Sequence, residues 1–223
     1  RLYYVVSDAN SGLNPNLNTR FYPGGRNSTN YQGLIVWGAQ VEIGAFPTSY
    51  IPTTTATVTR NADTASIQDT SSFFNPTEGT LYFHIPEAIP NNTGAVVSYP
   101  AIGFTVSTLG SSRTIQVFKS SSTSNYHALV RNDIGDQLSY SDPNSALAPA
   151  KVALAYKLND FGFCINSDSV YTDFYGILPR ADQIPALNIG SFNATNGRFN
   201  VPISKLAYYP VRLTNDQLQA LTR

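Results

Sequence analysis

The chain has 223 residues, with 14 basic and 14 acidic side chains and a formal net charge of zero. A neutral chain lacks the long-range field that draws proteins to nucleic acid or to an anionic membrane, so we expect neither partner. Because 42% of the residues are hydrophobic but no apolar run approaches the ~20 residues that span a bilayer, the composition predicts a large packed core and no membrane insertion.

The first third of the chain predicts two segments. The sequence contains no methionine and opens on Arg1, so we expect residues 1–46 to be the C-terminal strands of an incomplete upstream β module. Residues 47–73 are predicted to be an extended linker. A pair of prolines removes backbone donors that a sheet needs, and five threonines between positions 53 and 59 favour extended backbone.

Residues 74–223 contain ten short apolar or alternating runs separated by polar turns, a spacing typical of an all-β antiparallel sandwich. The turn residues agree, because Asn196 and Gly197 supply the positive φ that a tight hairpin requires. The expected strands are 79–85, 95–99, 102–108, 114–118, 126–131, 151–158, 160–165, 169–175, 186–192 and 203–210.

The last segment predicts a short helix. Thr214 can accept a hydrogen bond from the first turn while Gln217 returns one, which is the pattern of a capping box. Leu213, Leu218 and Leu221 then share one side of the helix. We expect this side to dock onto the sandwich.

Several stretches resemble one protein family. They are WGAQ and PTSYIPT around residues 37–53, FNPTEGTLYFHI at 74–85, KVALAYKLNDFGFCINSDSV at 151–170, and the closing segment from LNIGSF to LQALT at 187–222. These are similar to surface proteins of tailed-phage virions, in which a concanavalin-A/laminin-G-like domain follows a carbohydrate-binding-like jelly roll. The resemblance implies a concanavalin-A-like, two-sheet jelly-roll sandwich for residues 74–223, closed by the short C-terminal helix.

The same resemblance implies a function and a location. The chain would be a tail-fibre, tail-spike or head-fibre protein on the particle surface, a homotrimer that contacts other virion proteins and recognises a host-cell surface glycan. Two alternatives remain open. One is a polysaccharide-degrading enzyme or its accessory module, and the other is a purely structural decoration domain, which predicts a large exposed apolar patch.

No catalytic residues are expected. A retaining glycosidase needs two carboxylates about 5 Å apart, which one strand supplies most simply with acids at alternate positions. None of the three glutamates, Glu42, Glu78 and Glu87, has an acid two or four residues away. Cys164 lies in an apolar run and predicts a small buried side chain rather than a nucleophile. His84 is expected to lie on a strand with its side chain at the surface.

Four residues are candidates for ligand binding. Aromatic residues make up 12% of the chain, and a tyrosine ring can pack on the apolar face of a sugar while its hydroxyl stays polar. Two polar loops around positions 126–140 combine such rings with charge. We expect a ligand-binding patch at the rim of the sandwich, formed by Tyr126, His127, Arg131 and Tyr140.

No cofactor is expected, and calcium is left open as a metal ligand. The segments 132–142 and 166–173 offer the carboxylate and carbonyl oxygens that Ca²⁺ prefers. Neither segment has the spacing of an EF-hand loop, so an empty loop is favoured over a calcium site.

Overall fold

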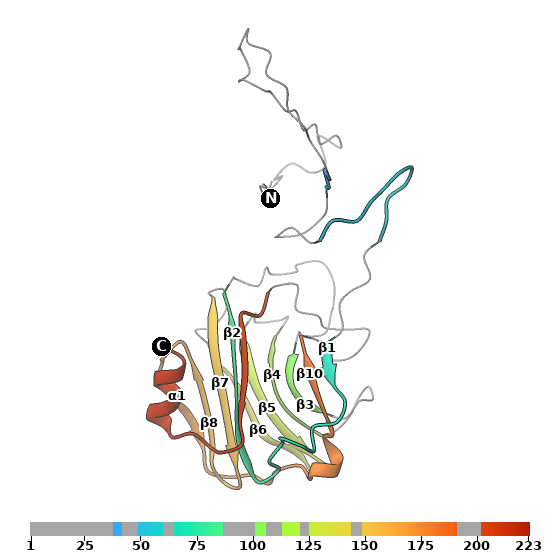
Figure 1. Cartoon of the computed structure of the whole chain (residues 1–223). Coiled ribbons are helices and arrows are strands. Elements are labelled where there is room, and N and C mark those ends of the chain that lie inside the picture. Colours follow the sequence, from blue (N-terminus) through green and yellow to red (C-terminus); the bar gives the residue numbers. More distant parts are fainter. Residues whose placement is uncertain are drawn as a thin grey trace. The chain divides into compact units, whose positions relative to one another are not determined.

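Figure 1 shows a computed structural model of the chain, which divides into two compact units, Arg1–Arg60 and Asn61–Arg223. The described residues are 38–41, 49–59, 65–86, 101–105, 113–120, 125–143, 149–190 and 202–223. In the first unit the described residues contain no helix or strand, and the Ile51 N–H donates to Gln40 Oε1 at 2.8 Å. The strands predicted before residue 47 lie almost wholly outside the described residues.

The second unit consists of two antiparallel sheets and a short C-terminal helix, so the predicted all-β sandwich is confirmed (Figure 1). The six-stranded sheet has the order β1 (Ala65–Ile67), β10 (Ala186–Ile189), β3 (Ala101–Thr105), β4 (Thr114–Lys119), β5 (Tyr126–Asn132) and β6 (Gly135–Ser141). The five-stranded sheet has the order β11 (Lys205–Tyr209), β2 (Glu78–Ile85), β7 (Ala150–Lys157), β8 (Phe161–Ile165) and β9 (Tyr171–Asp173).

Nine of the ten predicted runs overlap these strands, and the run at 95–99 lies outside the described residues. Two strands were not predicted. β6 is a polar edge strand that forms a hairpin with β5, and β1 lies within the segment that we expected to be linker. The sandwich therefore begins earlier than residue 74, since Thr70 also donates its backbone N–H to the Pro185 carbonyl at 3.0 Å.

The core lies between the sheets and follows the two-residue period of a strand. Along β5, for example, Ala128 and Val130 are buried while Arg131 is half-exposed on the outer face. Tyr208 and Tyr209 obey the same rule: Tyr208 packs edge-on against the buried Phe104, whereas Tyr209 packs on the outer face. The inward side chains of the five-stranded sheet are mainly Leu81, Phe83, Ile85, Val152, Leu154, Tyr156, Phe161, Phe163 and Ile165.

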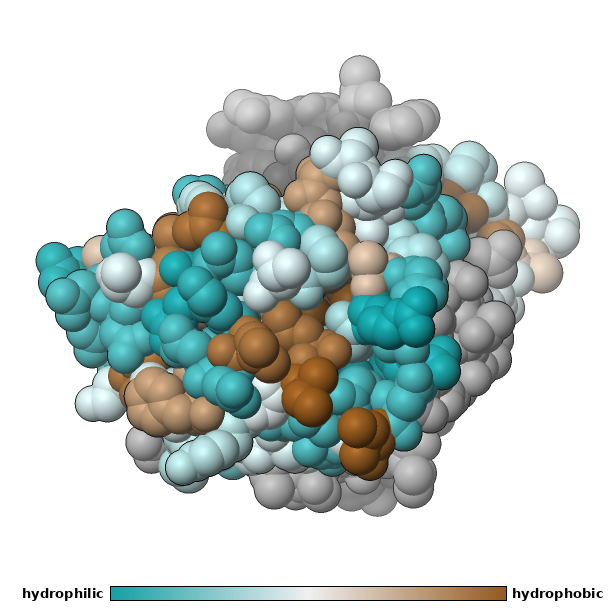
Figure 2. All heavy atoms as spheres, turned by 90° about the horizontal axis from the view of Figure 1, so that it is seen from below, coloured by the Kyte–Doolittle hydropathy of each residue, from teal (hydrophilic) through white to brown (hydrophobic). Residues whose placement is uncertain are grey.

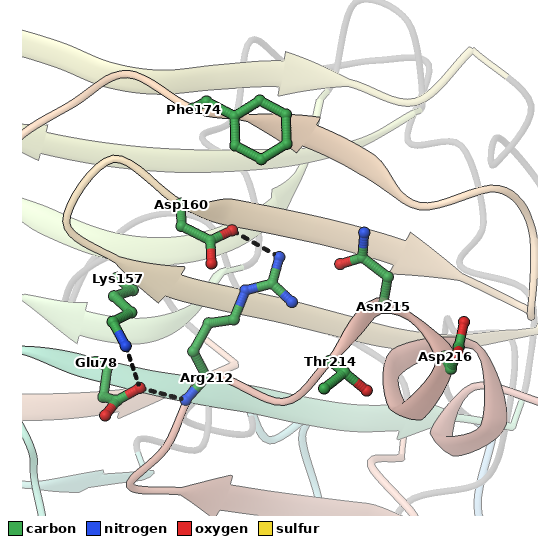
Figure 3. Close-up of a pocket in the computed structure, with 8 residues that line it drawn as sticks. All are labelled: Glu78, Lys157, Asp160, Phe174, Arg212, Thr214, Asn215 and Asp216. Atoms are coloured by element: carbon green, nitrogen blue, oxygen red, sulfur yellow. Dashed lines mark hydrogen bonds and ion pairs between the residues drawn. The ribbon is translucent and has the colours of Figure 1, made fainter.

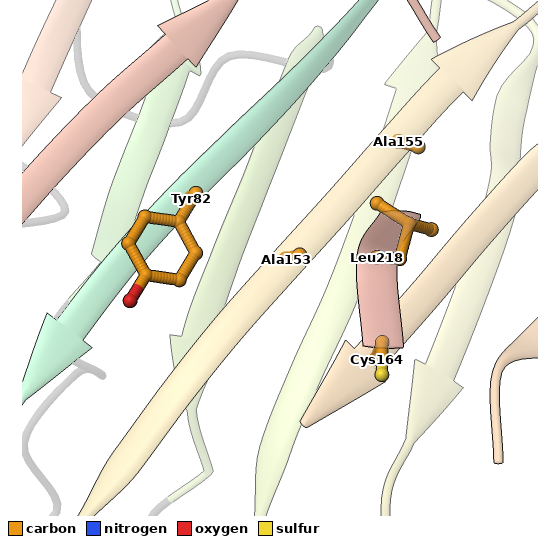
Figure 4. Packing of buried hydrophobic residues seen from close by; sticks show 5 residues of the cluster. All are labelled: Tyr82, Ala153, Ala155, Cys164 and Leu218. Atoms are coloured by element: carbon orange, nitrogen blue, oxygen red, sulfur yellow. The ribbon is translucent and has the colours of Figure 1, made fainter. Parts of the chain in front are cut away.

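The outer face of the five-stranded sheet is covered by α1 (Asn215–Leu221). Leu218 is fully buried there against Ala153, Ala155 and Cys164 (Figure 4). Because the strand residues beneath it are small, the helix approaches the sheet closely. The predicted docking of the helix is therefore confirmed, and so is the burial of Cys164, whose thiol pKa is raised by burial.

The start of α1 has the predicted capping box. Thr214 Oγ1 accepts a hydrogen bond from the Gln217 N–H at 3.3 Å, and Gln217 Oε1 accepts one from the Thr214 N–H at 2.9 Å. In the part of the chain that the structure describes, no helix is long and apolar enough to cross a membrane.

The first prediction concerns the anchor of α1. Leu218→Ala should lower the free energy of unfolding by about 2–5 kcal/mol, because it removes a fully buried side chain and leaves a cavity. Urea denaturation followed by far-UV circular dichroism measures the change. Leu158→Ala is the matched control, since the same substitution at an exposed leucine should change stability by less than about 0.5 kcal/mol. Equal effects at both leucines would contradict the packing described here.

The second prediction concerns the capping box. Thr214→Ala should cost about 1 kcal/mol of unfolding free energy, because two N–H groups at the start of the helix lose part of their hydrogen bonding. Thr214→Ser keeps the hydroxyl and should retain most of the stability. If Thr214→Ser lowered the unfolding free energy as much as Thr214→Ala, the stability would depend on the Thr214 methyl group and not on the capping hydrogen bond.

Candidate functional site

The lower end of the sandwich in Figure 1 gathers three chain segments. They are the β5–β6 turn around Ile134, the β7–β8 turn from Leu158 to Asp160, and the segment 174–178 that follows β9. The third segment bridges the two turns: the Asn159 N–H donates to the Gly176 carbonyl at 3.1 Å, and Asn132 Nδ2 donates to the Ile177 carbonyl at 3.1 Å. This end is opposite the one where β1 begins.

A hollow of about 520 Å³ lies at this end, on the outer face of the five-stranded sheet beside α1 (Figure 3). We call it the α1 hollow. Its walls come from the start of β2, the β7–β8 turn, the segment after β9 and the start of α1. The residues that line it are Glu78, Lys157, Asp160, Phe174, Arg212, Thr214, Asn215 and Asp216.

Arg212 lies at the centre of the α1 hollow, and its side chain is only 10% exposed. One guanidinium nitrogen, Nη2, donates to Asp160 Oδ1 at 2.8 Å, and the other, Nη1, donates to the Leu213 carbonyl at 2.6 Å (Figure 3). Its backbone N–H donates to Glu78 Oε2 at 3.2 Å. A buried charge needs such partners, so Arg212 ties the β7–β8 turn and β2 to the segment that leads into α1.

The remaining charged groups form the rim. Lys157 Nζ lies 3.6 Å from Glu78 Oε2 in a partly exposed ion pair. Asp216 lies in the first turn of α1 and is exposed. The α1 hollow thus holds three carboxylates and two cations.

Phe174 supplies an exposed aromatic face on the opposite side of Asp160 from Arg212 (Figure 3). The segment behind it is held in place. Asp173 Oδ1 accepts from the Tyr175 N–H at 2.9 Å, and a Cβ at Gly176 would lie 2.8 Å from the Phe161 ring, so this position requires glycine. The aromatic face is therefore carried by a well-braced segment.

The same end exposes a second feature, four large hydrophobic side chains that we call the apolar row: Ile134, Leu158, Tyr175 and Ile177. Ile134 and Tyr175 are each 82% exposed. Figure 2 views this end from below and shows apolar surface gathered near its middle among polar atoms. The apolar row and the α1 hollow are neighbours, because Phe174 directly precedes Tyr175.

The four residues predicted from the sequence do not form one patch. Tyr126 is 1% exposed and faces the core, so it is not part of a surface at the rim. Tyr140 stacks on Tyr171 with ring centroids 3.7 Å apart and meets Phe163 edge-on. Successive residues of a strand face opposite sides, so the grouping of Tyr126 with His127 is wrong. The alternation within β5 was the signal that would have separated them.

His127 and Arg131 do share the outer face of β5. His127 stacks on Phe118 and its Nε2 lies 3.1 Å from Ser139 Oγ, while Arg131 pairs with Asp136. Burial lowers the pKa of His127, and the bond from Arg131 lowers the pKa of Asp136. These side chains already hold protein partners, and a binding role for His127 and Arg131 stays a prediction.

Carboxylates in the two segments considered for calcium also have protein partners. Asp133 accepts from Arg113 and from Gln183, and Asp173 accepts from a backbone N–H. Among the described residues, no group of three or more His, Cys, Asp or Glu side chains is placed to hold a metal ion.

No protein-family model matches the sequence, and no curated protein matches it. Among solved structures, the chain is similar to the CBM40 of Ruminococcus gnavus IT-sialidase, with a TM-score of 0.51 and 17% identity over 67% of this chain and 84% of that chain. The same domain bound to α2,3 sialyllactose gives 0.49 at 15% identity over 67% and 84%, and Xenopus laevis galectin-Ib gives 0.40 at 9% over 66% and 100%. The likeness to the first of these shows the fold, a jelly-roll, lectin-like sandwich.

Proposed function

We propose that the chain is the glycan-binding sandwich of a phage virion surface protein, of the fibre or spike type, that attaches the particle to a host-cell glycan without catalysis. The observation that carries the glycan part is the α1 hollow, which combines an exposed aromatic face with a ring of hydrogen-bonding groups. The sequence resemblance supports the virion setting. The fold alone does not decide the role, because one architecture carries lectins, enzymes and packing modules.

The chemistry of the α1 hollow suits a sugar. Each sugar hydroxyl both donates and accepts, and Glu78, Asp160 and Asp216 offer acceptors while Lys157 offers donors. Phe174 presents a flat face on which the apolar side of a pyranose can stack. A volume of about 520 Å³ lies within the usual range for small-ligand sites.

Attachment through such an open site depends on how many copies of the site bind the cell surface at once. Each single contact is weak, and a homotrimer that presents three α1 hollows to one cell surface gains avidity without any new contact. We propose this trimer, together with contacts to other virion proteins, as the working form of the protein.

The non-catalytic part of the proposal rests on what two of the three carboxylates of the α1 hollow already do. Asp160 holds Arg212, and Glu78 holds Lys157 and the Arg212 backbone. A hydrolase needs one carboxylate to give up a proton and a second to act as base or nucleophile. Groups committed to fixed cations are poorly suited to that exchange.

A second candidate function is favoured by the apolar row. A structural decoration domain predicts an exposed apolar patch, and Ile134, Leu158, Tyr175 and Ile177 provide one at the end of the sandwich. In this alternative the lower end packs against another protein, and the α1 hollow is a by-product of how α1 docks.

The third prediction tests glycan binding. Phe174→Ala should weaken binding about tenfold, because it removes the stacking face from the α1 hollow. A glycan array and whole-cell binding with the full chain, with and without calcium, identify a ligand and measure the loss. Tyr175→Ala is the matched control, since this neighbouring aromatic residue does not line the hollow.

Equal losses for Phe174→Ala and Tyr175→Ala would place binding on the apolar row instead. The same samples are analysed for shortened sugar chains. Appearance of cleaved products would contradict the non-catalytic proposal and direct attention to Glu78, Asp160 and Asp216.

The fourth prediction tests the packing alternative. If the apolar row is an interface between copies, Ile134→Lys combined with Tyr175→Lys should shift the chain to smaller species in sedimentation velocity, because each lysine places a charge in a desolvated contact. Phe174→Ala should leave the distribution of species unchanged. If the double variant sediments as the same species as the unmodified chain, the apolar row is not an interface between copies.

A further inference from the structure

We infer that the α1 hollow selects neutral glycans and discriminates against sugars that carry a carboxylate. This inference rests on the proposed glycan binding and adds the class of ligand. It follows from how the charges inside the hollow are distributed among its own side chains.

The central cation of the α1 hollow is already paired with a carboxylate. The Arg212 side chain is 10% exposed; Nη2 donates to Asp160 Oδ1 at 2.8 Å, Nη1 donates to the Leu213 carbonyl at 2.6 Å, and Nε has no hydrogen-bond partner among the described residues. An acidic sugar is held best by a guanidinium that offers two parallel donors. The charge of Arg212 is balanced by Asp160, so a ligand carboxylate would have to compete with Asp160 for it.

The other cation of the α1 hollow, Lys157, also has a carboxylate beside it. Lys157 lies at the rim, 3.6 Å from Glu78, and the Glu78 carboxylate also accepts the Arg212 backbone N–H. A sugar carboxylate that approached Lys157 would therefore meet Glu78 as well. Its attraction to one charge would be offset by repulsion from the other.

One carboxylate of the α1 hollow, Asp216, is not balanced by a cation among the lining residues. Asp216 lines the α1 hollow, is exposed, and has no ion-pair partner among the described residues. Three carboxylates face two cations, so the hollow carries an excess of one negative charge. A neutral sugar meets hydrogen-bond acceptors and an aromatic face, whereas an anionic sugar meets like charge.

Three other arginines of the sandwich lie outside the α1 hollow and are also paired. Each of three further arginines on the described surface has an aspartate partner; the pairs are Arg113 with Asp133, Arg131 with Asp136, and Arg180 with Asp182. These three side chains, like Arg212, already have a carboxylate within ion-pair distance.

The experiment compares oligosaccharide pairs that differ by one sialic or uronic acid, titrated against the full chain by calorimetry at two salt concentrations. The neutral member should bind at least about tenfold more tightly, with little change as salt rises, because no ion pair with the ligand is screened. Tighter binding of the acidic members, weakened by salt, would overturn this inference and leave glycan binding intact. Binding of neither class would overturn the proposed function itself.

Three substitutions test whether the carboxylates of the α1 hollow cause the selectivity. Asp160→Asn removes the carboxylate that neutralises Arg212, so the ratio of acidic to neutral affinity should rise about tenfold or more. Asp216→Asn removes the excess charge at an exposed position and should move the ratio in the same direction by a smaller amount, which keeps the test decisive if Asp160→Asn does not fold. Asp182→Asn removes an exposed carboxylate outside the hollow and should leave the ratio unchanged. An unchanged ratio in a folded Asp160→Asn or Asp216→Asn variant would overturn the inference.

Discussion

The buried charge of Arg212 is the constraint on which the lower end of the sandwich depends. A guanidinium taken out of water must be paired where it lies, and Arg212 is paired by Asp160 from the β7–β8 turn. Gly162 leaves the necessary room, since a Cβ there would lie 3.0 Å from Leu218 and 3.1 Å from the Arg212 guanidinium. The docking of α1 and the shape of the hollow beside it therefore follow from the same set of contacts.

This arrangement explains why one end of the molecule offers two different surfaces. On the outer face of the five-stranded sheet, α1 and the Arg212 pair create a polar hollow with Phe174 at its edge. Across the open end between the sheets, the braced segment around Gly176 leaves Tyr175 and Ile177 exposed. A glycan suits the first surface and a protein suits the second, because sugars need dense hydrogen bonding and protein contacts need desolvated apolar area.

Elements with a strong local pattern in the sequence are the ones that the sequence predicts correctly. Strands with one or both faces buried, such as β2 and β7, have apolar runs that reveal them, and the capping box reveals the start of α1. β6 and β1 were not predicted because they are edge strands with few buried side chains. They form by backbone hydrogen bonding to a neighbouring strand, and such pairing does not require a pattern of apolar residues in the sequence.

The sequence by itself determined the fold class, the C-terminal helix with its cap, the burial of Cys164 and the absence of a net charge. Only the tertiary structure decided the candidate site. Glu78, Asp160 and Arg212 are far apart along the chain, and the order and register of β11, β2, β7 and β8 bring them to one end of one sheet. Tyr126 and His127 are adjacent in sequence yet face opposite sides of β5. Local pattern specifies which face a residue takes, whereas strand pairing over long distances specifies which residues meet.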